Sequence, residues 1–196
     1  MVWPDEVTLR GRHATLTPLK AKHAVKLAEA VADGELWRLW YTFIPAPQDV
    51  EAEIARRLGE RKKGTMLPFT VLDTAGEPIG MTTYMHIDAE ARRVEIGATW
   101  YRRSVQRTPV NTECKRMLLT HAFETLDCIA VEFRTNAFNF QSRRAIERLG
   151  ARQDGILRSH QRNKDGTLRD TVVYSIIAAE WPTVRTHLDF QLERPR

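Results

Sequence analysis

Apolar and polar positions follow two different periods along the first half of the chain. Residues 7–19 alternate weakly, as a strand does, whereas residues 21–31 and 50–58 carry apolar side chains at the spacing of an amphipathic helix. Three β-type runs follow at residues 67–72, 79–87 and 94–101, and a turn containing Gly76 joins the first two. The pattern predicts a strand, two successive helices and an antiparallel meander.

The second half of the chain changes period several times. An apolar stripe over residues 111–126 predicts a helix, residues 128–135 a strand, and residues 141–149 a short helix that Gly150 ends. Residues 155–162 and 171–177 flank a turn at 163–166, so the chain is expected to close with a hairpin. The order β-αα-βββ-α-β-α-ββ predicts an α+β fold with a mixed, mostly antiparallel sheet of about seven strands.

Composition narrows the class of protein. A length of 196 residues suits one domain over residues 1–196, and 42% hydrophobic with 28% charged residues is typical of a globular chain. No apolar run is long enough to span a membrane and no secretory leader is visible, which favours a cytoplasmic protein. Cys114 and Cys128 lack the spacing of a metal or disulfide motif, so we expect two core residues and no metal. The net charge of +5 suits an anionic ligand better than a nucleic acid.

Three stretches carry a family resemblance. They read VEIGATWY at 94–101, QRTPVNTE at 106–113, and NFQS at 139–142 followed by RLGA at 148–151. In this order and spacing the chain resembles the GNAT-fold N-acetyltransferases, and within them the RimJ/RimL-type branch, over nearly its whole length. The resemblance implies the GNAT fold, acetyl-CoA as co-substrate, and acetyl transfer to a primary amine of a protein N-terminus, a peptide or a small molecule. The resemblance is also compatible with a homodimer.

The resemblance assigns residues 106–113 to the loop that binds the acetyl-CoA pyrophosphate, because a helix start offers several convergent N–H donors. The family reads Q/R-x-x-G-x-G/A there; Gln106 matches, but Pro109 and Asn111 replace the glycine and the small residue. Thr108 is expected to cap the helix before Pro109, and Arg107 to supply the charge that the lost donor removes. An ordinary loop with solvated arginines is the alternative. The implied cofactor contacts are Trp100, Tyr101, Arg102, Gln106, Arg107, Thr108, Val110, Asn111, Thr112, Asn139, Ser142 and Arg143.

Acetyl transfer to nitrogen needs a neutral amine, and therefore a base. Glu95 interrupts an apolar strand beside the proposed loop and is the candidate; a structural ion pair with Arg92 or Arg93 is the alternative. The resemblance further implies a backbone N–H at a bulge near Trp100 and Tyr101, which would stabilise the oxyanion. It also implies that Ser142 protonates the departing thiol.

Four aromatic residues crowd into residues 37–43, and the resemblance places this segment beside the acceptor. Trp37, Trp40 and Tyr41 are therefore candidate acceptor-binding residues together with His86, although core packing explains aromatic clusters and single histidines more often. A second function fits the same sequence: a non-catalytic module that binds acyl-CoA. Pro109 and the absence of a tyrosine from the short helix at 141–149 favour that second hypothesis.

Overall fold

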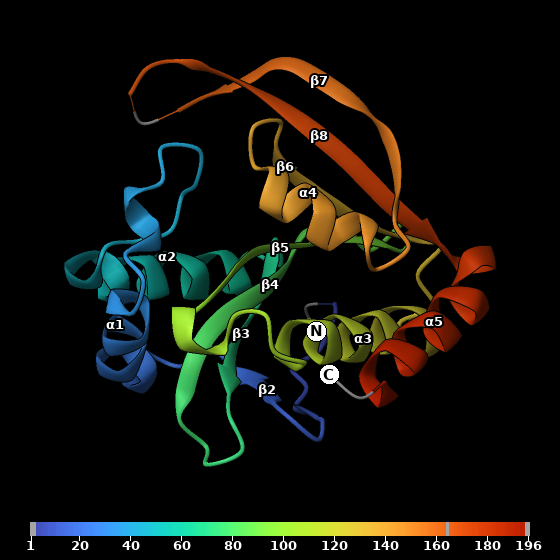
Figure 1. Ribbon diagram of the computed structural model, residues 1–196, viewed down its shortest axis with the longest axis horizontal. Coiled ribbons are helices and arrows are strands. Elements are labelled where there is room, and N and C mark those ends of the chain that lie inside the picture. The colour runs from blue at the N-terminus through green and yellow to red at the C-terminus, as the bar shows by residue number, and fades with distance from the viewer. Residues whose placement is uncertain (1–2, 164, 195–196) are drawn as a thin grey trace.

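One mixed sheet of eight strands runs through the protein (Figure 1). The computed structural model describes residues 3–163 and 165–194. The strands lie in the order β1-β2-β3-β4-β5-β6-β8-β7, and β5–β6 is the one parallel pair among them. Their bounds are β1 Leu9–Arg10, β2 Thr15–Pro18, β3 Met66–Leu72, β4 Pro78–Asp88, β5 Arg93–Tyr101, β6 Ala130–Asn136, β7 Arg152–Arg162 and β8 Leu168–Ile177.

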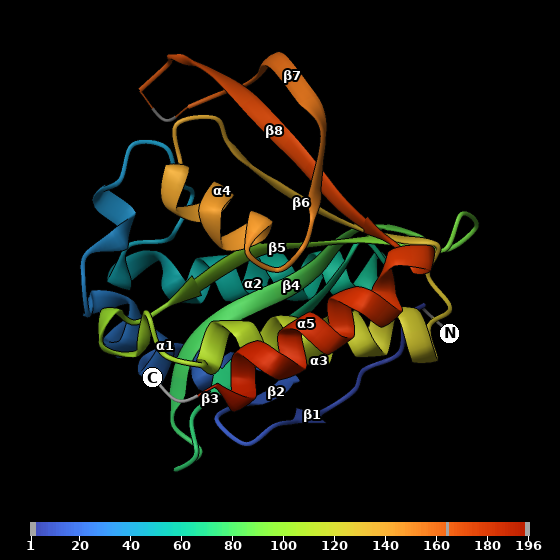
Figure 2. The ribbon, with the colours of Figure 1, turned by 45° about the vertical axis from the view of Figure 1, so that its right-hand side comes forward.

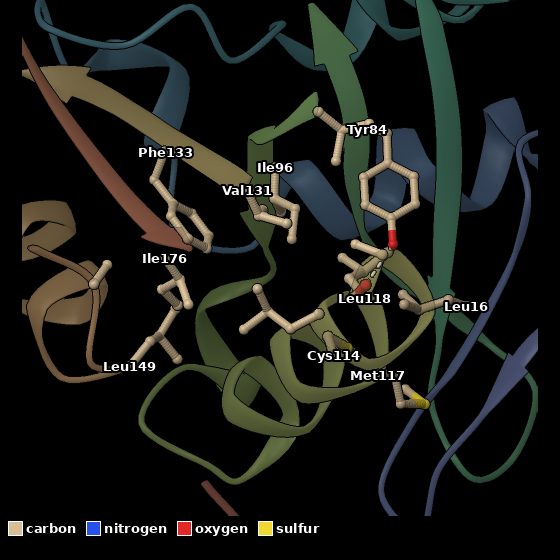
Figure 3. Close-up of a cluster of buried hydrophobic side chains, with 14 of the residues drawn as sticks. Leu16, Tyr84, Ile96, Cys114, Met117, Leu118, Val131, Phe133, Leu149 and Ile176 are labelled. Atoms are coloured by element: carbon tan, nitrogen blue, oxygen red, sulfur yellow. Dashed lines mark hydrogen bonds between the residues drawn. The ribbon is translucent and has the colours of Figure 1, made fainter. Parts of the chain in front are cut away.

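Helices cover the two faces of the sheet unequally (Figures 1 and 2). Helices α1 (Ala24–Ala32) and α2 (Val50–Lys62) pack on one face, where Met81 and Trp100 join their core cluster. Helices α3 (Val110–Thr120), α4 (Phe140–Glu147) and α5 (Trp181–Glu193) cover the other face around a larger core, part of which is drawn in Figure 3. Among the described residues, no helix covers the face of β6, β8 and β7 opposite to α4 (Figures 1 and 2). No helix of the described residues is long and apolar enough to cross a membrane.

The predicted fold class and the order of the elements are confirmed, with three differences. Residues 7–19 form two short strands, because the Glu113 carboxylate accepts the N–H groups of Arg12, His13 and Ala14 and holds a turn between them. A Cβ atom on Gly11 would lie 2.4 Å from that carboxylate, so the turn admits only glycine. The predicted helix over 111–126 ends at Thr120 and continues as a π turn at His121–Thr125.

The third difference is the C-terminus. The expected hairpin forms as β7 and β8, but the chain then continues into helix α5. Trp181, Val184 and Leu188 place one apolar stripe against the core, and Pro182 stands at the helix start, where its missing N–H costs nothing. The signal for this helix was therefore present in the sequence. The expected turn at 163–166 includes Lys164, which lies outside the described residues.

Candidate active site

Strands β5 and β6 part from each other in the middle of the sheet. Their ladder consists of three pairs, Arg93 with Ala130, Val94 with Val131 and Glu95 with Glu132. Both strands continue beyond these pairs, to Tyr101 and to Asn136 respectively. Glu95 therefore stands at the last paired position, at the point where the sheet opens.

A bulge lies in β5 directly beyond this point. Met81 pairs with Trp100 and Thr83 with Gly97, so Ala98 and Thr99 together oppose one residue of β4. Ala98 has a φ of 47°, a left-handed conformation that is uncommon for residues with a side chain. The bulge was expected near Trp100 and Tyr101, but both of these residues pair regularly with β4, and their side chains are buried in the two core clusters.

Two buried cations hold this bulge from opposite faces of the sheet. Arg57 of α2 donates from Nη1 to the Ala98 carbonyl oxygen at 3.3 Å and to a threonine of β4. Lys115 of α3 donates from Nζ to Thr99 Oγ1 at 2.7 Å and to Thr82 Oγ1 at 3.2 Å. No carboxylate pairs with Lys115 in the described chain, and burial lowers the pKa of its ammonium to about 8. The bulge is thus a fixed part of the structure.

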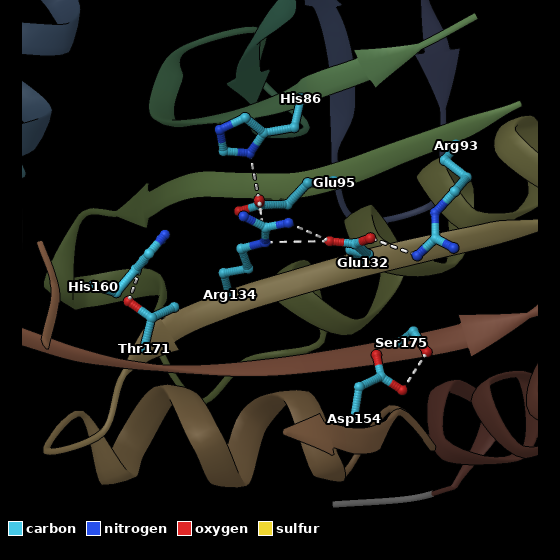
Figure 4. A network of polar contacts seen from close by, with 9 residues as sticks. All are labelled: His86, Arg93, Glu95, Glu132, Arg134, Asp154, His160, Thr171 and Ser175. Atoms are coloured by element: carbon cyan, nitrogen blue, oxygen red, sulfur yellow. Dashed lines mark hydrogen bonds and ion pairs between the residues drawn. The ribbon is translucent and has the colours of Figure 1, made fainter. Parts of the chain in front are cut away.

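Glu95 is the buried centre of a polar network (Figure 4). Its side chain is 5% exposed; Oε2 lies 2.7 Å from His86 Nδ1 and 3.4 Å from Arg134 Nε. Arg134 also pairs with Glu132, which in turn pairs with Arg93. A Cβ atom at Gly97 would lie 2.7 Å from Glu95 Oε1, so glycine leaves room for this carboxylate. The alternative interpretation, an ion pair of Glu95 with Arg92 or Arg93, names the wrong arginine, since Arg134 on the neighbouring strand takes that place.

His86 connects the buried carboxylate to solvent. Its side chain is 57% exposed, so the interpretation as a buried core histidine is wrong. Its backbone has a φ of 46° beside a register shift in the β4–β5 ladder, which turns the ring toward Glu95. The hydrogen bond to Glu95 raises the pKa of His86 above 6.5. Glu95 and His86 together offer a proton a path from the sheet to water.

The open face of the sheet beside this network is hollowed. A depression of about 500 Å³ lies over β6, β8 and β7, and its lining includes Arg93, Glu132, Arg134, Asp154 and Ser175. Asp154 Oδ1 accepts a hydrogen bond from Ser175 Oγ at 3.0 Å. The depression gives a ligand access to the charged residues around Glu95 from the face that carries no helix.

The predicted pyrophosphate loop leads into α3, but the helix begins at Val110 with Pro109 as its N-cap, so the expected cap at Thr108 is wrong by one residue. Pro109 has helical dihedral angles, its carbonyl oxygen accepts the first helical bond from Glu113 N, and Thr108 Oγ1 accepts from Val110 N at 3.4 Å. The first helical turn leaves N–H donors for an anion. Val110 and Thr112 are buried at this helix start.

Basic and polar residues surround this helix start. Arg107 is exposed with a φ of 62°, Asn111 is half-buried, Arg102 pairs with Asp33 at 3.1 Å, and Gln106 Nε2 donates to the Tyr101 carbonyl at 3.2 Å. The chain therefore presents positive charge beside the first turn of α3, which suits a pyrophosphate group.

Helix α4 begins beside the opening between β5 and β6. Asn139 Oδ1 accepts from Ser142 N at 3.0 Å, so Asn139 caps the helix. Arg143 donates to Tyr174 Oη at 3.1 Å and to the Ala137 carbonyl at 3.3 Å, and its guanidinium stacks on Phe140. Arg143 therefore has partners within the protein and is not a solvated surface arginine.

The aromatic segment between α1 and α2 divides into two parts. Trp37 packs against the core cluster of α1 and α2. Trp40 and Phe43 are 47% and 50% exposed; Trp40 lies 5.5 Å from the Tyr41 ring and 5.7 Å from the Phe138 ring, measured between centroids. This part of the segment borders the start of α4 and the strand β8, beside the opening in the sheet.

Sequence reasoning did not identify four of the charged residues in this region: Arg57, Lys115, Arg134 and Arg169. Arg57 and Lys115 occupy apolar faces of their helices, which is the one signal that could have marked them. The contact of Arg134 with Glu95 depends on the pairing of β5 with β6, which the sequence pattern does not specify.

Comparison with known proteins identifies the family. The model of the acetyltransferase (GNAT) domain matches residues 13–152. The chain belongs to the GNAT acetyltransferases. A Bacillus subtilis (strain 168) protein named "Putative ribosomal N-acetyltransferase YdaF" is 28% identical over 87% of this chain and 94% of its own length.

Solved structures extend this comparison. A GCN5-related N-acetyltransferase from Brucella melitensis is 30% identical with a TM-score of 0.85, covering 96% of this chain and 86% of its own. RimJ of Mycobacterium smegmatis, solved with CoA-disulfide, has the same fold with a TM-score of 0.78 at 23% identity over 96% and 95% of the two chains. The chain is therefore an acyltransferase enzyme, which argues against the non-catalytic alternative.

Proposed function

We propose that this enzyme transfers the acetyl group of acetyl-CoA to a primary amine, with Glu95 as the general base. The observation that supports this assignment is the position of Glu95: a buried carboxylate at the last paired residue of β5, where the sheet opens. The name of the B. subtilis relative refers to ribosomal N-acetylation, which favours a protein N-terminus or a peptide as the acceptor. A small amine is the alternative acceptor.

The proton of the amine has a defined route in this proposal. The amine enters from the open face, Glu95 accepts its proton directly or through one water, and His86 carries the proton to solvent from its half-exposed ring. Arg134 Nε lies 3.4 Å from Glu95 Oε2 and holds the carboxylate in place between proton transfers. The C–N bond then forms at the thioester carbon and the C–S bond breaks.

The bulge and helix α4 act on the two other charges that develop during the transfer, the oxyanion and the departing thiolate. The bulge at Ala98 and Thr99 leaves backbone outside the β ladder, and we assign one of its N–H groups to the developing oxyanion. The CoA thiolate leaves with a proton from Ser142, in the first turn of α4, or from water. The start of α3 with Arg102, Gln106 and Arg107 would bind the pyrophosphate.

Acetyl-CoA is expected to raise the melting temperature of the purified protein, because a ligand that binds only the folded state adds RT ln(1 + [L]/Kd) to its stability. At 100 times Kd this amounts to about 2.7 kcal/mol. Thermal melts with and without acetyl-CoA measure it, and thiol release with peptides, polyamines and small amines tests transfer. No shift and no heat of binding at millimolar acetyl-CoA would contradict the assignment.

Arg107→Ala is expected to weaken acetyl-CoA binding several-fold without lowering the melting temperature of the free protein, because the side chain is exposed beside the helix start. The loss should shrink at high salt, since screening weakens exposed charges. Calorimetric titration at two salt concentrations measures it, with Arg152→Ala on β7 as the control. Equal affinities for the wild type and Arg107→Ala at both salt concentrations would show that Arg107 takes no part in binding acetyl-CoA.

A further inference from the structure

Arg169 of β8 carries a positive charge that the protein itself leaves uncompensated. Its guanidinium is partly buried, its Nε atom is fully covered without a hydrogen-bond partner, and no carboxylate of the described residues forms an ion pair with it. Burial lowers the pKa of Arg169, and the more distant charge of Glu95 opposes that effect. A buried charge normally has a partner, so this guanidinium lacks one that the functional state would supply.

The position of Arg169 is on the acceptor side of the site. Val172, Tyr174 and Ile176 of β8 are fully buried beneath α4, so Arg169 and Val173 belong to the opposite, open face of the strand. Val173 lines the depression there and pairs with Arg134, the residue that contacts Glu95. Phe43 lies under the Arg169 guanidinium at 5.6 Å and fixes it at the edge of this face.

The carboxylates that could neutralise Arg169 are bound elsewhere. Asp170 accepts hydrogen bonds from Arg158 Nε at 2.8 Å and from Ser159 N at 2.7 Å. Glu95 is joined to His86 and Arg134. The charge of Arg169 is thus left for a group from outside the chain.

A second unpaired donor lies close to Arg169. Asn136, at the end of β6, is 2% exposed and its Nδ2 has no partner, while its Oδ1 accepts from Phe138 N at 3.0 Å. That bond fixes which end of the amide is the unsatisfied donor. Asn136 pairs with Thr171, two residues from Arg169, and so lies diagonal to it across the neighbouring strand. These two unpaired donors can bind an acceptor group that comes from outside the chain.

We propose that Arg169, supported by Asn136, binds a carboxylate carried by the acceptor close to its reactive amine. This inference rests on the proposed function and specifies its substrate class. The amine would lie at Glu95 and the carboxylate at Arg169, so a zwitterionic acceptor places each charge opposite its complement. A guanidinium suits a carboxylate because its planar fork donates two parallel hydrogen bonds. The acceptor is therefore a free amino acid or a peptide whose first residue is acidic.

Two pairs of acceptors distinguish these sources. The first pair is an amino acid and its carboxamide; the second is a peptide beginning with Glu and the same peptide beginning with Gln. We expect the carboxylate member of one pair to have a kcat/KM higher by about 10- to 100-fold, the effect of one charge-assisted hydrogen-bonded contact. Arg169→Gln should bring that ratio near one, and Arg169→Lys should keep part of it.

Binding measurements make the test independent of turnover. Calorimetric titration of the four acceptors into the protein saturated with CoA should show the same preference, and its loss in Arg169→Gln. Arg38→Gln, an exposed arginine between α1 and α2, is the matched control and should leave the ratio unchanged. An unchanged ratio in Arg169→Gln, or equal binding of acid and amide in the wild type, overturns the inference. Carboxylate-dependent binding without acetyl transfer to any amine supports the subsite and contradicts the proposed function.

Discussion

Glu95→Gln is expected to lower kcat for acetyl transfer by about 10²- to 10⁴-fold while acetyl-CoA still binds, because glutamine keeps the shape of the side chain but cannot take a proton. The amide can still accept from Arg134, and Arg134 keeps its ion pair with Glu132, so the network around residue 95 retains most of its contacts. Steady-state kinetics with calorimetric measurement of acetyl-CoA affinity tests this result.

A matched control lies on the next strand. Glu132→Gln removes a carboxylate of the same network, opposite Glu95 in the ladder and paired with the same Arg134, but without contact to His86. If the network matters only for structure, both variants should lose melting temperature and rate together. If Glu95 is the base, the large rate loss belongs to Glu95→Gln alone. A wild-type rate in Glu95→Gln on every acceptor would remove Glu95 from the mechanism.

The pH dependence gives an independent readout. The bond to Glu95 raises the pKa of His86, so His86 takes up its proton as the pH falls through a value above 6.5 and then blocks the outward proton path. We expect an acidic limb above pH 6.5 in the wild-type profile of kcat/KM, and a lower His86 pKa in Glu95→Gln, measurable from its ring signals by NMR. Acceptors with different amine pKa values separate this limb from deprotonation of the amine itself.

The sequence predicted the order of the elements and the place of Glu95, because both depend on local periodicity and on one polar residue in an apolar strand. It did not predict the partners of Glu95. His86 reaches it through an irregular β4 and Arg134 through the parallel pairing of β5 with β6, and both contacts depend on how neighbouring strands pair.

The bulge lies two residues before its predicted position for a similar reason. Its position depends on the register between β4 and β5 and on the bonds from Arg57 and Lys115, which come from two different helices. Helix α5 is different, since Trp181, Val184 and Leu188 follow helical spacing in the sequence and could have predicted it. Tertiary pairing, and not local propensity, accounts for most of what the sequence could not show.

Lys115→Met is expected to abolish a rise in stability that the wild type shows between about pH 8 and pH 10.5. The pKa of Lys115 is about 8 in the folded protein, where burial disfavours the ammonium, and 10.5 is its ordinary value. Between these values the unfolded chain binds a proton that the native state has lost. The free energy of unfolding therefore increases with pH across this window, and below pH 8 the folded protein bears the full cost of the buried charge.

The size of this rise in stability follows from the difference between the two pKa values of Lys115. A difference of about 2.5 pKa units corresponds to about 3 kcal/mol at 1.36 kcal/mol per unit. Urea unfolding from pH 7 to pH 10.5 measures it, and the difference between variant and wild type at each pH removes the titration of all other groups. Methionine fills the volume without a charge, and Thr82 and Thr99 still bond each other at 2.8 Å. The advantage of Lys115→Met over the wild type should shrink by about 3 kcal/mol as the pH rises.

Two further variants separate burial from charge alone. Lys62→Met, on the exposed side of α2, removes a lysine without burial and should give a curve parallel to that of the wild type. Lys115→Arg keeps a charge that cannot be lost below pH 11, so it should bear the cost of the buried charge at every pH and show no rise in stability. Parallel curves for Lys115→Met and the wild type would show that the ammonium is hydrated and not buried. A rise that vanishes in both Lys115 variants and persists in Lys62→Met places a buried, titrating amine directly behind the bulge that the proposed mechanism uses.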